Sequence, residues 1–273
     1  MSLAVQRASS VDWNGLREVL HAEWTKLRTL PGTYWLLAGI VVLTMGIGAA
    51  AASAVTCANA ACGQDPAKVS LTGVYLGQAV VAVLGVLVIG GEYDTGMIRV
   101  TFAAAPRRMS VLAAKAILVS GLTAVAGAVA VLGSVVVGWI IMPGHGFTAA
   151  HGYPALSPAD GSMARAAFGS VLYLVLIALL GLGIGALVRD SAVAIGTVLA
   201  LLYLSPIIAM VISDPHWHNR IERYTPMTAG MAIQATRNLA SMPIGPWEGL
   251  GVLGLWAAGA LLAGGTVLHL RDA

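Results

Sequence analysis

Six long apolar stretches dominate the hydropathy pattern of the chain, and shorter polar segments separate them. The apolar stretches are Thr33–Ala54, Gly73–Gly91, Leu118–Met142, Ala166–Val188, Ala192–Ile212 and Trp247–Leu268. Each is close to the roughly 20 mostly apolar residues that a helix needs to cross a bilayer. The runs are continuous rather than alternating, which favours helices over a membrane β-barrel. We therefore expect an all-α membrane protein with six transmembrane helices.

The polar segments predict how the chain is divided and oriented. We expect a cytoplasmic N-terminus over 1–32, a transmembrane domain over 33–268 and a cytoplasmic tail over 269–273. Six spans place both termini on one side, and lysine and arginine concentrate on cytoplasmic segments. Of the 15 lysines and arginines, ten fall on the side of the termini and five on the other. This bias predicts a multi-pass protein of the cell membrane with both termini in the cytoplasm.

Composition agrees with a lipid environment. Hydrophobic residues make up 58% of the chain and charged residues only 10%, whereas soluble domains are about 25% charged. The net charge of +3 is small and the cations are scattered, which argues against nucleic acid as a partner. Membrane lipid is the expected surrounding.

The segment Val11–Leu30 has the periodicity of an amphipathic helix. Large apolar residues recur at spacings of three and four on one helix face: Trp13, Leu16, Leu20, Trp24 and Leu27. Tryptophans with flanking cations are typical of a helix that lies in a membrane surface. We favour this interpretation over a helix packed on the same chain, because the first span follows at once.

The connection Gly91–Lys115 is the longest and most charged link between two spans on the expected cytoplasmic side. Its acidic residues come first and its basic residues follow: Glu92, Asp94, Arg99, Arg107, Arg108 and Lys115. A short helix is predicted over about 95–104, because Pro106 would end it. Charges of both signs suit docking of a soluble partner. The alternative is that the arginines only set membrane topology.

Two absences in the sequence bear on the source of energy. No G-x-x-x-x-G-K-[ST] loop occurs, so any ATP must be bound by another chain. Apart from Glu248 at one edge, no aspartate, glutamate, lysine, arginine or histidine lies well inside the six apolar stretches. Ion-coupled carriers usually keep such groups at membrane depth. This pattern favours energy delivered by a partner over an ion-coupled secondary transporter.

Cysteines and histidines give weaker indications. Cys57 and Cys62 share one predicted outer loop and could form a disulfide in an oxidising exterior, or could remain unlinked. His216 and His218 have the spacing of metal ligands, but no further ligand cluster supports a site; we expect no bound metal. No catalytic set of serine, histidine and acid stands out.

Small residues recur in two of the predicted spans. Gly181, Gly183 and Gly185 lie in the fourth span, and Ser134 and Gly138 lie in the third. Such residues allow two helices to approach closely. The other interpretation is a general preference for glycine in this composition.

Two motifs carry a resemblance to a known family. The pattern E-Y-x-x-G-x-x-R at Glu92–Arg99 is followed by P-R-R and A-x-K, and E-W-T-K-L-R-T-L precedes the first span at Glu23–Leu30. With the hydropathy pattern, these motifs resemble the permease subunits of ABC-2 type transporters, especially actinobacterial export-type subunits.

The resemblance implies a division of roles along the chain. The N-terminal helix would be an elbow helix, the loop 92–115 would hold a coupling helix from Glu92 to about Ala104, and 213–246 would hold short outer helices. The residues implied in docking are Glu92, Tyr93, Asp94, Gly96, Arg99, Arg107 and Arg108. Glu92 would face a basic partner, and Arg99 would help to hold the loop.

The resemblance also implies partners. A separate ABC ATPase subunit would carry ATP and Mg²⁺, and this chain would have no cofactor and no catalytic residue of its own. A second permease chain, identical or related, would complete the substrate pathway of an exporter. Family members move drugs, peptides, lipids or polysaccharides, so the substrate stays open. The alternatives are a membrane-embedded enzyme or scaffold protein, and an ion-coupled carrier.

Overall fold

The protein is a bundle of helices. The computed structural model describes residues 13–57, 63–104, 108–148, 153, 161–212 and 214–271, and within these ranges all regular secondary structure is helical. The long helices are α2 (Pro31–Ala54), α4 (Val74–Asp94), α6 (Arg108–Ile141), α7 (Gly161–Val188), α8 (Ser191–Val211) and α11 (Pro246–Arg271). All six are long and apolar enough to cross a membrane. The prediction of an all-α chain with six long apolar helices is confirmed.

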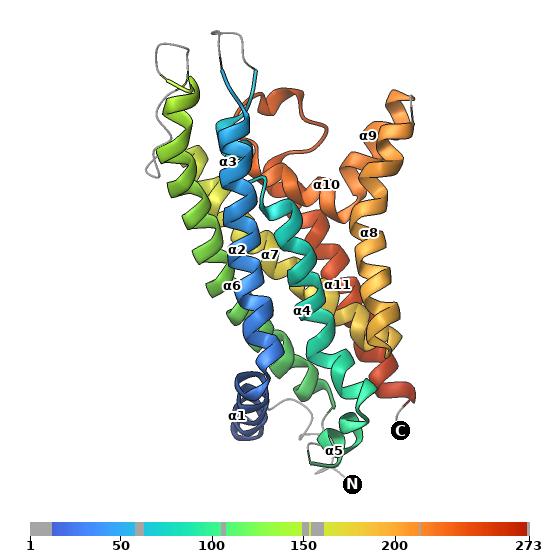
Figure 1. The fold of residues 1–273 in the computed structure, drawn as a ribbon. Coiled ribbons are helices and arrows are strands. Elements are labelled where there is room, and N and C mark those ends of the chain that lie inside the picture. The colour runs from blue at the N-terminus through green and yellow to red at the C-terminus, as the bar shows by residue number, and fades with distance from the viewer. Residues whose placement is uncertain are drawn as a thin grey trace.

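Short helices mark the two ends of the bundle (Figure 1). At one end, here called the α5 end, α1 (Trp13–Thr29) lies across the bundle and α5 (Met97–Ala104) lies near the last turn of α11. The opposite end is called the α9 end. Its short elements are α3 (Pro66–Ser70), η1 (Met142–His145), α9 (Pro215–Tyr224), α10 (Pro226–Met231), η3 (Ala232–Gln234) and η4 (Leu239–Ser241). The first and last described helices both reach the α5 end, as an even number of spans requires.

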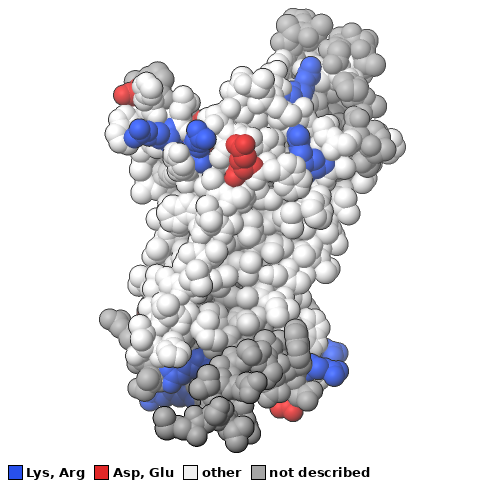
Figure 2. All heavy atoms as spheres, turned by 180° about the vertical axis from the view of Figure 1, so that it is seen from behind, with Lys and Arg blue, Asp and Glu red and all other residues white. Residues whose placement is uncertain are grey.

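Charged side chains avoid the middle of the molecule. On the face that Figure 2 shows, the described lysines, arginines and acids gather toward the two ends, and the band between them is free of charge. Large apolar side chains such as Trp35, Met210 and Leu255 are strongly exposed. Water would disfavour such a surface, whereas bilayer hydrocarbon requires it. The architecture is that of a multi-pass helical membrane protein.

The centre of the bundle is the contact between α4 and α7, where glycine permits close backbone approach. A Cβ atom at Gly85 would lie 2.2 Å from the carbonyl oxygen of Ala178, and one at Gly181 would lie 2.6 Å from that of Ala82. Both distances are far below a van der Waals contact. Gly183 meets α11 in the same way, with Ala260 at 2.6 Å. The interpretation of these span-four glycines as helix contacts is therefore confirmed.

The observed helices extend the predicted spans. Five of them begin within about five residues of the predicted start, but α6 begins at Arg108, ten residues before Leu118. The early part of α6 contains Lys115, which is 1% exposed. A lysine inside a bundle needs opposite charges nearby, and those charges come from other helices.

Candidate functional site: a buried charge cluster at the α5 end

Four charged side chains from three helices meet at the α5 end. This charge cluster consists of Glu23 and Lys26 of α1, Glu92 of α4 and Lys115 of α6. Lys115 Nζ lies 2.6 Å from Glu23 Oε2 and 2.8 Å from Glu92 Oε1. It also donates to the carbonyl oxygen of Val88 at 3.0 Å. The three donors of this ammonium group are therefore all used.

Lys26 connects the same two carboxylates from the other side. Its Nζ lies 2.7 Å from Glu23 Oε1 and 2.9 Å from Glu92 Oε1, and donates to Thr101 Oγ1 of α5 at 3.1 Å. Burial lowers the pKa of Lys26, but hydrogen bonds to Glu23 and Glu92 outweigh burial and raise the pKa above its ordinary value. Lys26 is therefore a cation at neutral pH, and α1, α4, α5 and α6 share one polar junction.

The charges of the cluster balance. Two lysines face two glutamates, and the glutamates and Lys115 are buried. Moving an unpaired charge out of water costs several kcal/mol, and close opposite charges with good hydrogen bonds offset that cost. Removing one member leaves the others uncompensated, so the cluster specifies how α1 docks on the bundle.

The N-terminal helix follows the predicted stripe only in part. Leu27 is buried and Leu20 is half-buried, but Trp24 is 43% exposed, and the side chains of Trp13 and Leu16 lie outside the described residues. The face of α1 that packs on the bundle also carries Glu23 and Lys26. The apolar pattern did not predict a contact for either residue, because their partners on the bundle lie far along the chain: Lys115 is 92 residues from Glu23, and Glu92 is 66 residues from Lys26.

The structure corrects two predictions for Glu92. The predicted coupling helix runs from Glu92 to about Ala104, but Glu92 belongs to the last turn of α4, and α5 begins at Met97. The turn between them contains Gly96 at a φ of 70°, a left-handed conformation that ends helices and favours glycine. Glu92 is also predicted to face a partner, yet it is 8% exposed because two lysines hold its carboxylate inside.

The other predicted docking residues lie around a hollow beside α5. Tyr93, Gly96, Arg99 and Arg108 line this space of about 670 Å³. Asp94 is exposed and its Oδ1 accepts a hydrogen bond from the backbone of Ser191. Arg107 lies outside the described residues. Arg189, which the sequence did not single out, joins the lining from the link between α7 and α8.

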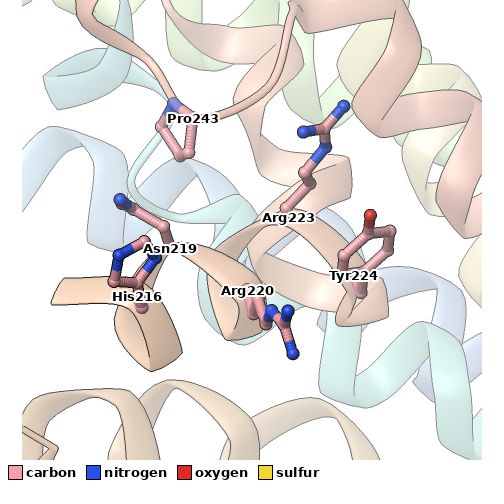
Figure 3. Close-up of a pocket in the computed structure, with 6 residues that line it drawn as sticks. All are labelled: His216, Asn219, Arg220, Arg223, Tyr224 and Pro243. Atoms are coloured by element: carbon pink, nitrogen blue, oxygen red, sulfur yellow. The ribbon is translucent and has the colours of Figure 1, made fainter. Parts of the chain in front are cut away.

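The α9 end carries the predicted short helices within 213–246. A hollow of about 310 Å³ lies there. Its lining includes His216, Asn219, Arg220 and Arg223 of α9 (Figure 3). The Nδ1–H group of His218 donates to the carbonyl oxygen of Ala209 at 3.1 Å, and its Nε2 lies 3.4 Å from Glu222 Oε1. Among the described residues, no three histidine, cysteine or acidic side chains are grouped to hold a metal ion.

Two loops at the α9 end are joined by one carboxylate. Asp65 Oδ2 accepts from the backbone N–H groups of Thr236 at 2.6 Å and Arg237 at 3.1 Å. Its Oδ1 accepts from the Thr236 hydroxyl at 2.6 Å and from the backbone of Ala67, which caps α3. The sequence does not predict this contact. Nothing near Asp65 in the sequence marks residues 171 positions away.

The structure describes one of the two cysteines that could form a disulfide. Cys57 is buried and is disulfide-bonded rather than a free thiol. Cys62 lies outside the described residues.

Comparisons with known proteins add no assignment: no protein-family model matches the chain, and no curated protein matches it significantly. The resemblance to ABC-2 permeases therefore rests on the sequence motifs and the hydropathy pattern.

Proposed function

We propose that this chain is the membrane-spanning subunit of an ABC-2 type transporter, driven by a separate ATPase that docks at the α5 end. One observation carries the proposal: α5 is exposed at the surface and is also hydrogen-bonded to the charge cluster. Val100 is 70% exposed and Met97 is 46% exposed, so α5 offers apolar side chains to a partner. From the same helix, Thr101 bonds Lys26 and Glu92.

The charge cluster links α5 to two of the long helices, α4 and α6. A force on α5 reaches Thr101, then Lys26 and Glu92, and through Glu92 and Lys115 it reaches the ends of α4 and α6. Rigid, fully hydrogen-bonded junctions transmit displacement better than loose apolar contacts. In this proposal Glu92 holds the junction together, and exposed residues of α5 touch the ATPase.

The remaining features follow from the ABC-2 assignment. The α5 end faces the cytoplasm of the cell, where ATP and Mg²⁺ are bound by the partner. Two permease chains enclose a pathway, and nucleotide binding shifts them between states with different substrate affinity. Export is the proposed direction, with drugs or lipids among the substrate classes that the family handles.

Co-purification tests the proposal. The full chain is co-expressed with ABC ATPase subunits from the same operon and is captured in detergent. We expect ATPase recovery and ATP turnover with the parent chain, and at least a tenfold loss of recovery for Val100→Asp, since about 1.4 kcal/mol corresponds to tenfold. Thr25→Asp adds the same charge on an exposed face of α1 and should leave recovery unchanged. Equal recovery with both variants would contradict docking at α5.

An ion-coupled carrier is the second candidate, because Lys115 and Glu92 are ionisable groups inside two of the long apolar helices. Their mutual neutralisation and their place at the α5 end support it less than a docking function. Substrate uptake into vesicles driven by a pH gradient, with no ATPase present, would favour this candidate.

A further inference from the structure

The hollow beside α5 is a basic site that is separate from the charge cluster. Its lining residues are Tyr93, Gly96, Ile98, Arg99, Phe102, Arg108 and Arg189, and we call it the arginine pocket. We propose that the arginine pocket binds a phosphate group, carried by the headgroup of an anionic phospholipid. This inference does not depend on an ATPase partner.

The three arginines reach the pocket from three different parts of the fold. Arg99 is an exposed residue of α5, Arg108 begins α6, and Arg189 links α7 to α8. No carboxylate is present among the described residues that line the pocket. Three guanidinium groups around one open space of about 670 Å³ create a positive potential, which attracts an anion with several acceptor oxygens.

Two of these guanidinium groups are held in place by the end of α11. Arg108 Nη1 donates to the carbonyl of Leu268 at 2.9 Å, and Arg189 Nη2 donates to that of Val267 at 3.0 Å. The last carbonyls of a helix carry partial negative charge. Each guanidinium group also lies over an aromatic ring, Arg108 at 5.2 Å from Phe102 and Arg189 at 5.6 Å from Tyr93. The pocket is thus organised before any ligand arrives, which favours binding.

The backbone of Arg189 adopts a conformation that is unusual for an arginine. Its φ is 64°, and its N–H donates to the carbonyl of Gly185 at the end of α7. Helices that end in this left-handed conformation usually place glycine there. An arginine is strained at such a position, and its side chain supplies the cation that contacts α11 and lines the pocket.

Two acids lie beside pocket residues in the sequence but do not line the pocket. The Oδ1 atoms of Asp94 and Asp190 accept hydrogen bonds from the backbone of Ser191 at 3.4 Å and of Val193 at 2.8 Å, at the start of α8. A helix N-terminus stabilises acids. Both carboxylates therefore have partners of their own at the start of α8.

Exposed apolar side chains favour a lipid over a free phosphate ion. Met109 follows Arg108 directly, Leu187 lies two residues before Arg189, and Leu270 lies two residues after Leu268. They are 50%, 41% and 76% exposed. A ligand with a phosphate at one end and hydrocarbon chains at the other satisfies both the pocket and these exposed apolar side chains, which lie close to it along the chain.

The test uses the purified full chain in detergent with three probes: phosphatidylglycerol, phosphatidylcholine and inorganic phosphate. Native mass spectrometry measures bound lipid, and the thermal midpoint Tm measures stabilisation. We expect phosphatidylglycerol to bind and raise Tm, and Arg99→Gln to raise its half-saturating concentration about fivefold, the equivalent of one exposed charge contact. Arg28→Gln removes an exposed cation of α1 at the same end and should change nothing.

Arg189→Gln is the second variant and should weaken binding further; its elution as a single folded species is checked first. Because Arg99 is exposed, its variant decides the outcome even if Arg189→Gln does not fold. Equal losses for Arg99→Gln and Arg28→Gln would indicate non-specific surface charge and overturn the proposal. So would equal binding of phosphatidylcholine, or protection by inorganic phosphate where phosphatidylglycerol gives none.

Discussion

Lys115 Nζ and Glu92 Oε1 lie 2.8 Å apart inside the bundle, and this pair joins α6 to α4. Neither side chain could be buried alone at an acceptable cost. Together with Glu23 and Lys26 they make a junction of balanced charge.

Lys115→Met should be among the most destabilising single substitutions at the α5 end. It leaves two buried glutamates with Lys26 alone, and breaking a buried ion pair from one side costs about 3–5 kcal/mol. Reversible unfolding in mixed detergent micelles measures the free energy. Lys68→Met is the matched control, because Lys68 is exposed on α3 and its loss should cost less than about 0.5 kcal/mol. Similar losses for both variants would contradict the assigned role of the cluster.

A second substitution should partly rescue the first. In the double variant Lys115→Met with Glu23→Gln, one lysine and one glutamate remain, Lys26 and Glu92, which lie 2.9 Å apart. Charge balance is restored, so the loss of stability should be smaller than the sum of the single losses by about 0.5–3 kcal/mol. A full double-mutant cycle by the same unfolding assay gives this coupling energy; additive losses would show that the two residues act independently.

The α4–α7 contact should not tolerate a single methyl group. At Gly85 the added Cβ would lie 2.2 Å from the carbonyl oxygen of Ala178, so Gly85→Ala must displace backbone, at a cost of about 1–3 kcal/mol. Gly121→Ala in α6 is the control, because its Cβ would meet nothing within 4 Å. The control should be neutral or slightly stabilising, since alanine favours helices. Thermal midpoints of the two proteins compare the effects.

Asp65→Ala should loosen the α9 end. The carboxylate accepts hydrogen bonds from Ala67, Thr236 and Arg237, and its loss leaves several donors unsatisfied, at about 1–3 kcal/mol. Asp214→Ala is the comparison, because Asp214 caps α9 through His216 alone among the described contacts and should cost about 1 kcal/mol. Faster hydrogen exchange at Thr236 and Arg237 only in Asp65→Ala is the expected signature.

Docking of α1 should be insensitive to pH up to strongly alkaline conditions. The folded pKa of Lys26 is raised above its ordinary value of 10.5, so its stabilising contribution is complete below that value and is lost as pH rises through the folded pKa. Hydrogen exchange in 17–29, corrected for the intrinsic rate, should be equal at pH 7 and 9 and should increase above about pH 10.5. Lys26→Met should remove the alkaline step. A loss of protection between pH 7 and 9 in the parent would assign the transition to another group.

The long helices were predictable because their cause is local. A run such as Ala192–Ile212 must bury its backbone polar groups within itself in a bilayer, and a helix does so without help from other segments. The span-four glycines were also visible, since Gly181 and Gly185 recur at a spacing of four on one face, toward α4. The start of α6 was not predicted, because Lys115 interrupts the apolar pattern and only distant glutamates permit its burial.

The amino-acid sequence by itself determined the six apolar helices, the N-terminal helix, the short helix after the second span and the concentration of basic residues on the side of the termini. The tertiary structure decided that Glu92 faces inward to Lys115 and Lys26, that Asp65 joins two loops, and that three arginines surround one pocket. The reason is the range of the forces. Hydropathy and turn formation depend on neighbours along the chain, whereas an ion pair is decided by which helices meet in space.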